Sequence, residues 1–139
     1  MKYMLITNAS QQDYDGMGGK ATDKPAWTTE EFNAMVEFMT AFNKSLEDSG
    51  ELVETRGLAG PVHTRRITGL KDGVPVVTDG PYAETQEVLA GYWIIDCDGI
   101  DRAVQIATEL SKCPGPAHVL AGGPYIDVRP LQEAAGDML

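Results

Sequence analysis

The chain has 139 residues, of which 42% are hydrophobic and 23% are charged, as in a soluble globular protein. This length predicts a single domain, 1–139, and excludes two domains with separate cores. Eleven basic and twenty-one acidic side chains give a formal charge of −10. Such a chain repels phosphate backbones and anionic membranes, so we expect neither as a partner.

No stretch is apolar over the length needed to cross a bilayer, and the apolar run at residues 3–6 is too short for a signal peptide. We therefore expect a cytoplasmic protein. Cys97 and Cys113 lack the Cys-x-x-Cys spacing of zinc and redox motifs. Both are predicted to be reduced thiols.

The chain begins with a predicted strand at residues 2–8, rich in strand-forming residues. Residues 10–26 contain several glycines and only scattered apolar side chains, which predicts a long loop. Such a loop is either a flexible surface insertion or a lid over a pocket. The pattern leaves both readings open.

Thr28 and Glu31 have the spacing of a helix-capping box, and apolar residues then recur at three- and four-residue intervals until Gly50. This predicts a helix whose apolar stripe faces the core. The stripe consists of Phe32, Met35, Val36, Met39, Phe42 and Leu46. Residues 52–58 then predict a second strand.

Two β-rich runs, 64–68 and 74–78, flank the dipeptide Asp72-Gly73, which is a strong hairpin signal. The hairpin delivers the chain to the turn at residues 79–81, Asp-Gly-Pro. Proline restricts both its own backbone and that of the preceding residue, so this turn is predicted to be rigid.

Residues 87–96 form the longest aromatic and β-branched stretch and predict the central strand. Asp98 is the predicted cap of a second helix, which ends at 113–116, Cys-Pro-Gly-Pro. A glycine-rich loop at 118–124 and a final strand at 125–131 follow.

The order of elements predicts an α+β fold, a ferredoxin-like βαββαβ sandwich with a β-hairpin insertion and a C-terminal tail at 132–139. In such a fold both helices cover one face of a four-stranded sheet. The other face must either be polar or be buried against a partner. The central strand has Tyr92, Trp93, Ile94 and Ile95 in succession. Both of its faces are therefore predicted to be buried, and we expect a homodimer whose sheets face each other.

Asp79 is the first candidate for a functional acid, because its turn is rigid and a partly buried carboxyl can act as a general acid or base. It is equally well explained as a brace of the turn. Glu84 and Glu87 are better explained as solvated acids or as helix-start residues than as a catalytic pair.

The two histidines, His63 and His118, lie in loops flanked by glycine and proline. If acid-base chemistry occurs at Asp79, His63 is the favoured base, because the hairpin returns its end close to its start. We therefore predict that His63 and Asp79 approach within hydrogen-bonding distance, directly or through one water. The other candidates for the base are Tyr82 or Tyr92, although tyrosine titrates much higher, and a second carboxylate, Glu84.

In the final strand Asp127 and Arg129 alternate with Ile126 and Val128. If the apolar pair faces the helices, the charged pair faces the cleft between the two sheets of the dimer. Arg129 then either binds an anionic group of a ligand or pairs with an acid.

The sequence contains no phosphate loop, dinucleotide fingerprint or nucleophile elbow, and its two histidines support no metal site. We therefore expect neither a cofactor nor a metal. Two function classes stay open: a small-molecule enzyme, and a binding or regulatory module without catalysis.

The stretch from Thr78 to Tyr92, TDGPYAETQEVLAGY, closely resembles the signature of the DGPF branch of the YCII-related family. Three further segments resemble the same family in the same order. They are residues 2–5, the pair Cys113-Pro114, and residues 127–131.

The resemblance implies the dimeric α/β-barrel form of the ferredoxin-like fold, in which two sheets face each other and enclose clefts. It also implies a protein of unproven activity, suspected of small-molecule chemistry through a His and Asp pair. Some DGPF members are associated with alternative sigma factors, which implies a regulatory role. The ligand-binding residues suggested by the signature and the final strand are Tyr82, Glu84, Tyr92 and Arg129.

The chain also departs from the family pattern. Tyr82 replaces the usual Phe, Gln86 the usual Lys, and Ala90 the usual Gly. The first helix contains no histidine, so a dyad that takes its histidine from that helix cannot form in this chain.

Overall fold

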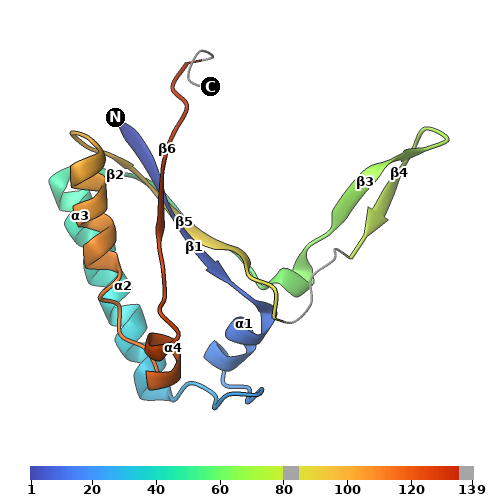
Figure 1. Ribbon diagram of the computed structural model, residues 1–139, viewed down its shortest axis with the longest axis horizontal. Helices are drawn as coiled ribbons and strands as arrows, with labels where there is room; N and C mark the ends of the chain where they lie inside the picture. The colour runs from blue at the N-terminus through green and yellow to red at the C-terminus, as the bar shows by residue number, and fades with distance from the viewer. Residues whose placement is uncertain (80–84, 135–139) are drawn as a thin grey trace.

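The computed structural model describes residues 1–79 and 85–134, and Figure 1 shows the arrangement of its helices and strands. The elements are β1 Lys2–Ala9, α1 Gln11–Met17, α2 Thr29–Ser49, β2 Leu52–Gly57, the 3₁₀ turn η1 Pro61–His63, β3 Arg66–Lys71, β4 Val74–Thr78, β5 Val88–Asp96, α3 Ile100–Leu110, α4 Ala117–Ala121 and β6 Asp127–Pro130.

Four strands form one antiparallel sheet in the order β2-β5-β1-β6. The two long helices, α2 and α3, cross between these strands and lie on the same side of the sheet (Figure 1). The predicted mixed α+β fold with an antiparallel sheet is confirmed, and the strand order is that of a ferredoxin-like sandwich. β3 and β4 form a separate two-stranded sheet, as the hairpin signal predicts.

The core lies between the sheet and the two long helices. Leu5 of β1 and Ile95 of β5 are fully buried there, and Trp93 is only 7% exposed. The Trp93 indole Nε1–H donates to Asn43 Oδ1 of α2 over 2.7 Å, and its ring meets Phe42 edge to face. A buried indole N–H needs such an acceptor, so this bond fixes how α2 sits on the sheet.

α2 begins and ends where the sequence predicts. The Thr28 hydroxyl accepts from the Glu31 amide, the Glu31 carboxylate accepts from the Thr28 amide, and Gly50 ends the helix in the left-handed region with φ 78°. The apolar stripe is only partly in the core. Phe32 and Val36 are 39% and 44% exposed, so the prediction that the whole stripe faces the core is wrong for these two.

Two short helices, α1 and α4, lie in segments predicted to be loops. α1 begins at a capping box in which the Ser10 hydroxyl accepts from the Asp13 amide and the Asp13 carboxylate accepts from the Ser10 amide. α4 follows Pro116, whose fixed φ suits a helix start. The predicted cap Asp98 is also wrong, because Gly99 occupies the N-cap of α3 without any side-chain bond.

The β3–β4 hairpin, here called the hairpin arm, projects away from the body on the side opposite α2 and α3 (Figure 1). Asp72 and Gly73 both have positive φ, 53° and 78°, which is the geometry that a two-residue hairpin turn requires. Every residue of both strands is exposed.

Cys97 and Cys113 are free thiols, as predicted. Within residues 1–79 and 85–134, no helix has the length and apolar character needed to span a membrane.

Candidate functional site

The face of the sheet that points away from α2 and α3 is here called the open face. Because Cα partners in antiparallel strands share a face, the strand register assigns its side chains to two rows across the sheet. One row reads Arg56, Tyr92, Ile6, Asp127, and the next reads Glu54, Ile94, Met4, Arg129. The four central side chains are only half-buried. The open face is thus an apolar centre with a cation and an anion at each edge.

One edge of the open face is already hydrogen-bonded. The Tyr92 hydroxyl donates to Glu54 Oε2 over 3.1 Å, and Arg56 Nη2 lies 3.8 Å from Glu54 Oε1. Partial removal from water and the bond to Glu54 raise the pKa of Tyr92 above 10.0, which makes it a poor general base at neutral pH.

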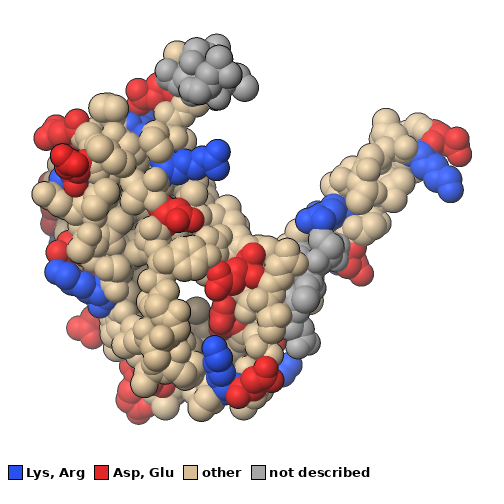
Figure 2. Space-filling view, viewed as in Figure 1, with Lys and Arg blue, Asp and Glu red and all other residues tan. Residues whose placement is uncertain are grey.

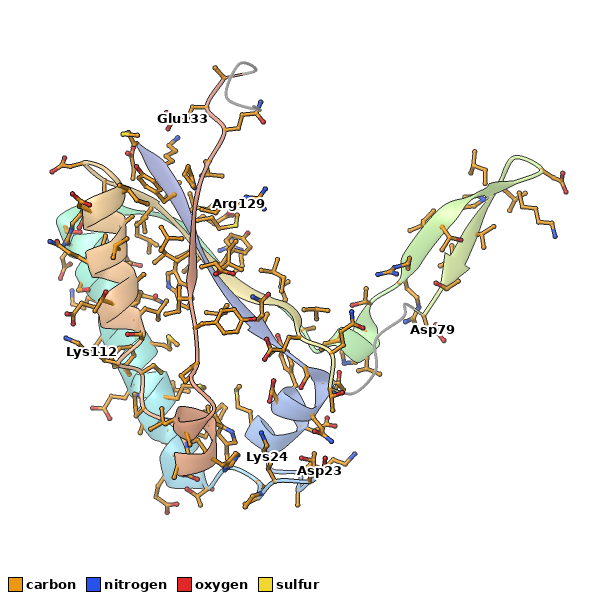
Figure 3. All side chains as sticks on the ribbon, viewed as in Figure 1. Asp23, Lys24, Asp79, Lys112, Arg129 and Glu133 are labelled. Carbon is orange, nitrogen blue, oxygen red and sulfur yellow. The ribbon has the colours of Figure 1, made fainter. Side chains whose placement is uncertain are left out.

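The opposite edge carries Arg129, which is labelled in Figure 3. No hydrogen bond or ion pair to its guanidinium is found among residues 1–79 and 85–134, although Asp127 is two residues away on the same face. Of the alternatives for Arg129, pairing with its own Asp127 is therefore not observed. The predicted ligand-binding residues Tyr92 and Arg129 do share this face, in neighbouring rows.

Asp79 and His63 lie at the base of the hairpin arm, after β4 and in η1 respectively. The Asp79 side chain is 92% exposed, and its Oδ1 lies 3.7 Å from Arg65 Nη1 (Asp79 labelled in Figure 3). Within the described part of the chain, no direct hydrogen bond or ion pair joins His63 to Asp79. A contact through one water stays a prediction.

Two further candidates, Tyr82 and Glu84, lie outside the described residues. Glu87 and His118, which the sequence ranks low, line a cavity of about 410 Å³ at the lower end of the sheet. In Figure 2 the molecule is visibly hollowed there. The volume is within the range of small-molecule sites.

The cavity lies on the helix side of the sheet and is closed by the two short helices. Its apolar wall combines side chains from α1, the following loop, α2, α3 and the segments around α4, namely Met17, Trp27, Met35, Met39, Leu110, Val119 and Ile126. The sequence did not decide whether residues 10–26 are a flexible insertion or a lid over a pocket. The structure favours the lid, because α1 and its loop form one side of this cavity.

α1 is attached to the body through Tyr14 and Gln11. The Tyr14 hydroxyl donates to the Leu58 carbonyl over 2.7 Å and lies 3.3 Å from the Ala90 carbonyl. Gln11 Oε1 accepts from the Val62 amide over 2.9 Å. Burial raises the pKa of Tyr14 above 10.0, so the phenol keeps its proton and remains a donor at neutral pH.

Two polar side chains of the cavity, Tyr125 and Glu87, are hydrogen-bonded to each other. The Tyr125 hydroxyl donates to Glu87 Oε2 over 2.6 Å, and this bond is the main reason that the pKa of Tyr125 is raised. Burial raises the pKa of the Cys113 thiol, which keeps it protonated and a weak nucleophile.

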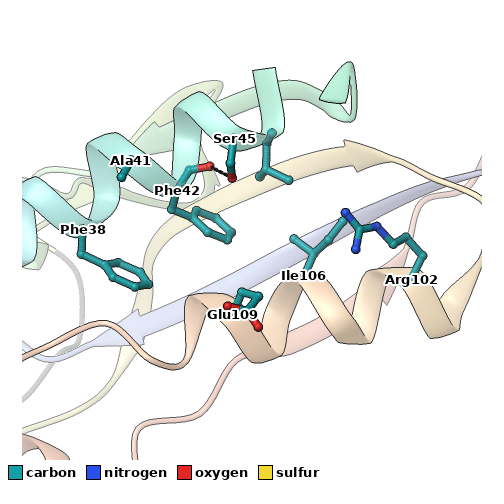
Figure 4. Close-up of a pocket in the computed structure, with 8 residues that line it drawn as sticks. Phe38, Ala41, Phe42, Ser45, Arg102, Ile106 and Glu109 are labelled. Carbon is teal, nitrogen blue, oxygen red and sulfur yellow. Dashed lines mark hydrogen bonds between the residues drawn. The ribbon is translucent and has the colours of Figure 1, made fainter. Parts of the chain in front are cut away.

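A second, smaller hollow of about 270 Å³ lies between α2 and α3, as Figure 4 shows. Its polar groups already have partners. The Ser45 hydroxyl donates to the Phe42 carbonyl, and the Arg102 guanidinium binds both oxygens of Glu51 over 2.8 and 2.9 Å. We regard it as a groove between packed helices.

No cluster of three or more His, Cys, Asp or Glu side chains suited to a metal ion occurs in the described residues. The sequence indicates the open-face residues through their two-residue alternation. It missed the cavity, whose walls come from segments far apart in the chain. One local signal for α1, which forms part of the cavity wall, was available. Ser10 and Asp13 have the spacing of a helix-capping box.

The chain is similar to known proteins over most of its length. A family model described as a YCII-related domain matches residues 1–115. The chain is also 33% identical over 106 residues to an uncharacterized protein, R00369, of Rhizobium meliloti (strain 1021), an alignment that covers 76% of this chain and 80% of that protein. By its sequence the chain therefore belongs to the YCII-related family.

Proposed function

We propose that this protein belongs to the DGPF branch of its family and acts as a homodimer that binds a small polar molecule in the cleft between two facing sheets. The observation that carries the proposal is the charge pattern of the open face. Its apolar centre favours burial, and its charged edges decide which partner fits.

The pattern is complementary to itself. If a two-fold axis runs along the strands, Arg56 meets Asp127 of the second copy and Glu54 meets Arg129. If the axis runs across the strands, Arg56 meets Glu54 and Arg129 meets Asp127. Either axis pairs each cation with an anion, as the surface of an isologous dimer requires.

The hairpin arm also supports a second copy of the chain as the partner. It extends on the side of the open face, and Ile67, Leu70 and Val74 on it are each at least 63% exposed. The arm is also cationic, with Arg66 and Lys71 against Asp72, whereas the whole chain carries −10. A two-stranded sheet alone is marginally stable in water, and contact with an acidic second copy would stabilise it.

Charge reversal tests the dimer. Arg129→Glu should convert dimer to monomer in light scattering at micromolar concentration, whereas Lys44→Glu on the far side of α2 should not. Adding Glu54→Arg restores the dimer if the axis runs along the strands, and adding Asp127→Arg restores it if the axis runs across them. A monomeric wild-type protein would overturn the proposal.

The ligand is proposed to bind in this cleft, with Arg129 as the partner of an anionic group. Asp79, at the base of the hairpin arm, is the proposed source of acid-base chemistry. A thermal-shift screen of polar metabolites tests it. Hits should weaken in Arg129→Gln, and hits that depend on acid chemistry should disappear in Asp79→Asn.

A non-catalytic module is the second candidate function. It is favoured by one observation, the 92% exposure of the Asp79 side chain beside Arg65, which is typical of a turn brace. If Asp79→Asn lowers thermal stability but leaves every ligand bound and every turnover assay unchanged, the module is the better description.

A further inference from the structure

The cavity closed by α1 and α4 is separate from the cleft proposed above. Thr7, which lines it, points to the same side of the sheet as Leu5 and Trp93, which is the helix side. The open face, with Arg129, is on the other side. A ligand in this cavity would therefore bind each copy of the chain independently of dimer formation.

The cavity has a wall suited to a flat or branched apolar group. The Trp27 indole lies between two glycines: a methyl group on Gly16 would come within 3.8 Å of its Cδ1, and one on Gly115 within 3.5 Å of its Cη2. The Trp27 amide donates to the Gly16 carbonyl over 2.9 Å. Met35 and Met39 of α2 face the same space, and methionine adapts to irregular apolar shapes.

The acids that line the cavity already accept hydrogen bonds. Asp13 Oδ2 accepts from the Ser10 amide over 2.8 Å, and Glu87 Oε2 accepts from the Tyr125 hydroxyl over 2.6 Å. Both carboxylates remain acceptors, but one oxygen of each is already used by an internal donor.

Three lining side chains that are not engaged can donate hydrogen bonds, although glutamine and neutral histidine can also accept them. In the described residues no side-chain hydrogen bond or ion pair engages Lys24, His118 or Gln12, all of which line the cavity. Lys24 lies on the loop below α1 (Figure 3). Lys24 is exposed, so an anion bound to its ammonium stays partly in water.

We propose that this cavity binds a small carboxylic acid with an aromatic or branched apolar body. The body packs against Trp27 and the methionines, and the carboxylate pairs with Lys24, with His118 and Gln12 as further donors. A phosphate monoester is a poorer fit, because its larger charge gains less from an apolar wall and is repelled more by a chain of charge −10.

Two probes of the same shape and opposite charge test the proposal: 3-phenylpropanoate and 2-phenylethylamine, titrated at low millimolar concentration by calorimetry and by Trp fluorescence. The acid should bind and the amine should bind at least about tenfold more weakly, which is the effect of one charge-assisted hydrogen bond. Equal or tighter binding of the amine, or no binding of the acid, overturns the ligand class.

Three variants and one matched control locate the site. Lys24→Met should weaken binding of the acid about two- to fivefold, because Lys24 is exposed. The matched control Lys44→Met, which removes a lysine paired with Asp48, should leave it unchanged. Met35→Trp should fill the cavity and abolish binding. Arg129→Gln should have no effect, and a loss of binding in that variant would place the probe in the sheet cleft and refute this site.

Discussion

Tyr14→Phe tests whether α1 is held in place by one side chain. The hydroxyl donates to the Leu58 carbonyl over 2.7 Å, with the Ala90 carbonyl at 3.3 Å. The Ala90 carbonyl also accepts from the Leu58 amide, and Leu58 is 40% exposed, so water can replace part of what is lost. We therefore expect a loss of about 1 kcal/mol, the ordinary net value of one hydrogen bond.

For a chain of this length, about 1 kcal/mol lowers the melting temperature by about 3–5 °C. Tyr3→Phe is the matched control, because within residues 1–79 and 85–134 the Tyr3 hydroxyl donates only to the weak acceptor Met1 Sδ at 3.9 Å. Urea denaturation measures both variants, and hydrogen exchange should show faster exchange of α1 amides in Tyr14→Phe alone. Equal losses in the two variants, or unchanged exchange in α1, would refute the reasoning.

The pH dependence of stability provides a second measurement on the same residue. Burial raises the pKa of Tyr14 above 10.0 in the folded state, so the unfolded chain loses this proton first. The contribution to stability is complete below pH 10 and decreases as the pH rises through the folded-state pKa. Tyr14→Phe should make the alkaline side of the stability profile less steep.

Three other changes have defined outcomes. Asn43→Ala leaves the Trp93 indole N–H without its acceptor and should cost about 1–3 kcal/mol in urea denaturation, a loss that Asn43→Gln should partly recover. Gly50→Ala places a side chain at φ 78° and should cost about 1 kcal/mol by the same assay. The bond to Arg102 lowers the pKa of Glu51 below 4.5. The stability that this pair contributes is therefore present above pH 4.5 and is lost as the pH falls further. Arg102→Gln should make the melting temperature less dependent on pH in this acidic range.

The parts of the fold that the sequence predicts are those that depend on local signals. The capping box of Thr28 and Glu31 and the glycine at position 50 define α2, and Asp72-Gly73 defines the hairpin. Each signal acts within a few residues, so it needs no knowledge of the tertiary structure.

The parts that the sequence does not predict depend on contacts between distant segments. α1 has only 7 residues and contains Gly16, so it has little helix propensity of its own, and its Tyr14 is bound to residues 44 and 76 positions away. The cavity has the same origin. Alternation along each strand could place Tyr92 and Arg129 on one face. No local pattern brings Lys24, Trp27 and Gly115 to the same cavity.

The hairpin arm has a further consequence for assembly. In a two-stranded sheet each strand is an edge, with a row of backbone groups that can recruit further strands. Pro75 removes one backbone donor from β4, and Arg66 and Lys71 put like charges on β3, so neither edge favours the addition of another identical strand. In the dimer proposed above, contact through the side chains of the arm would close on a finite pair of molecules, and growth into fibres is disfavoured.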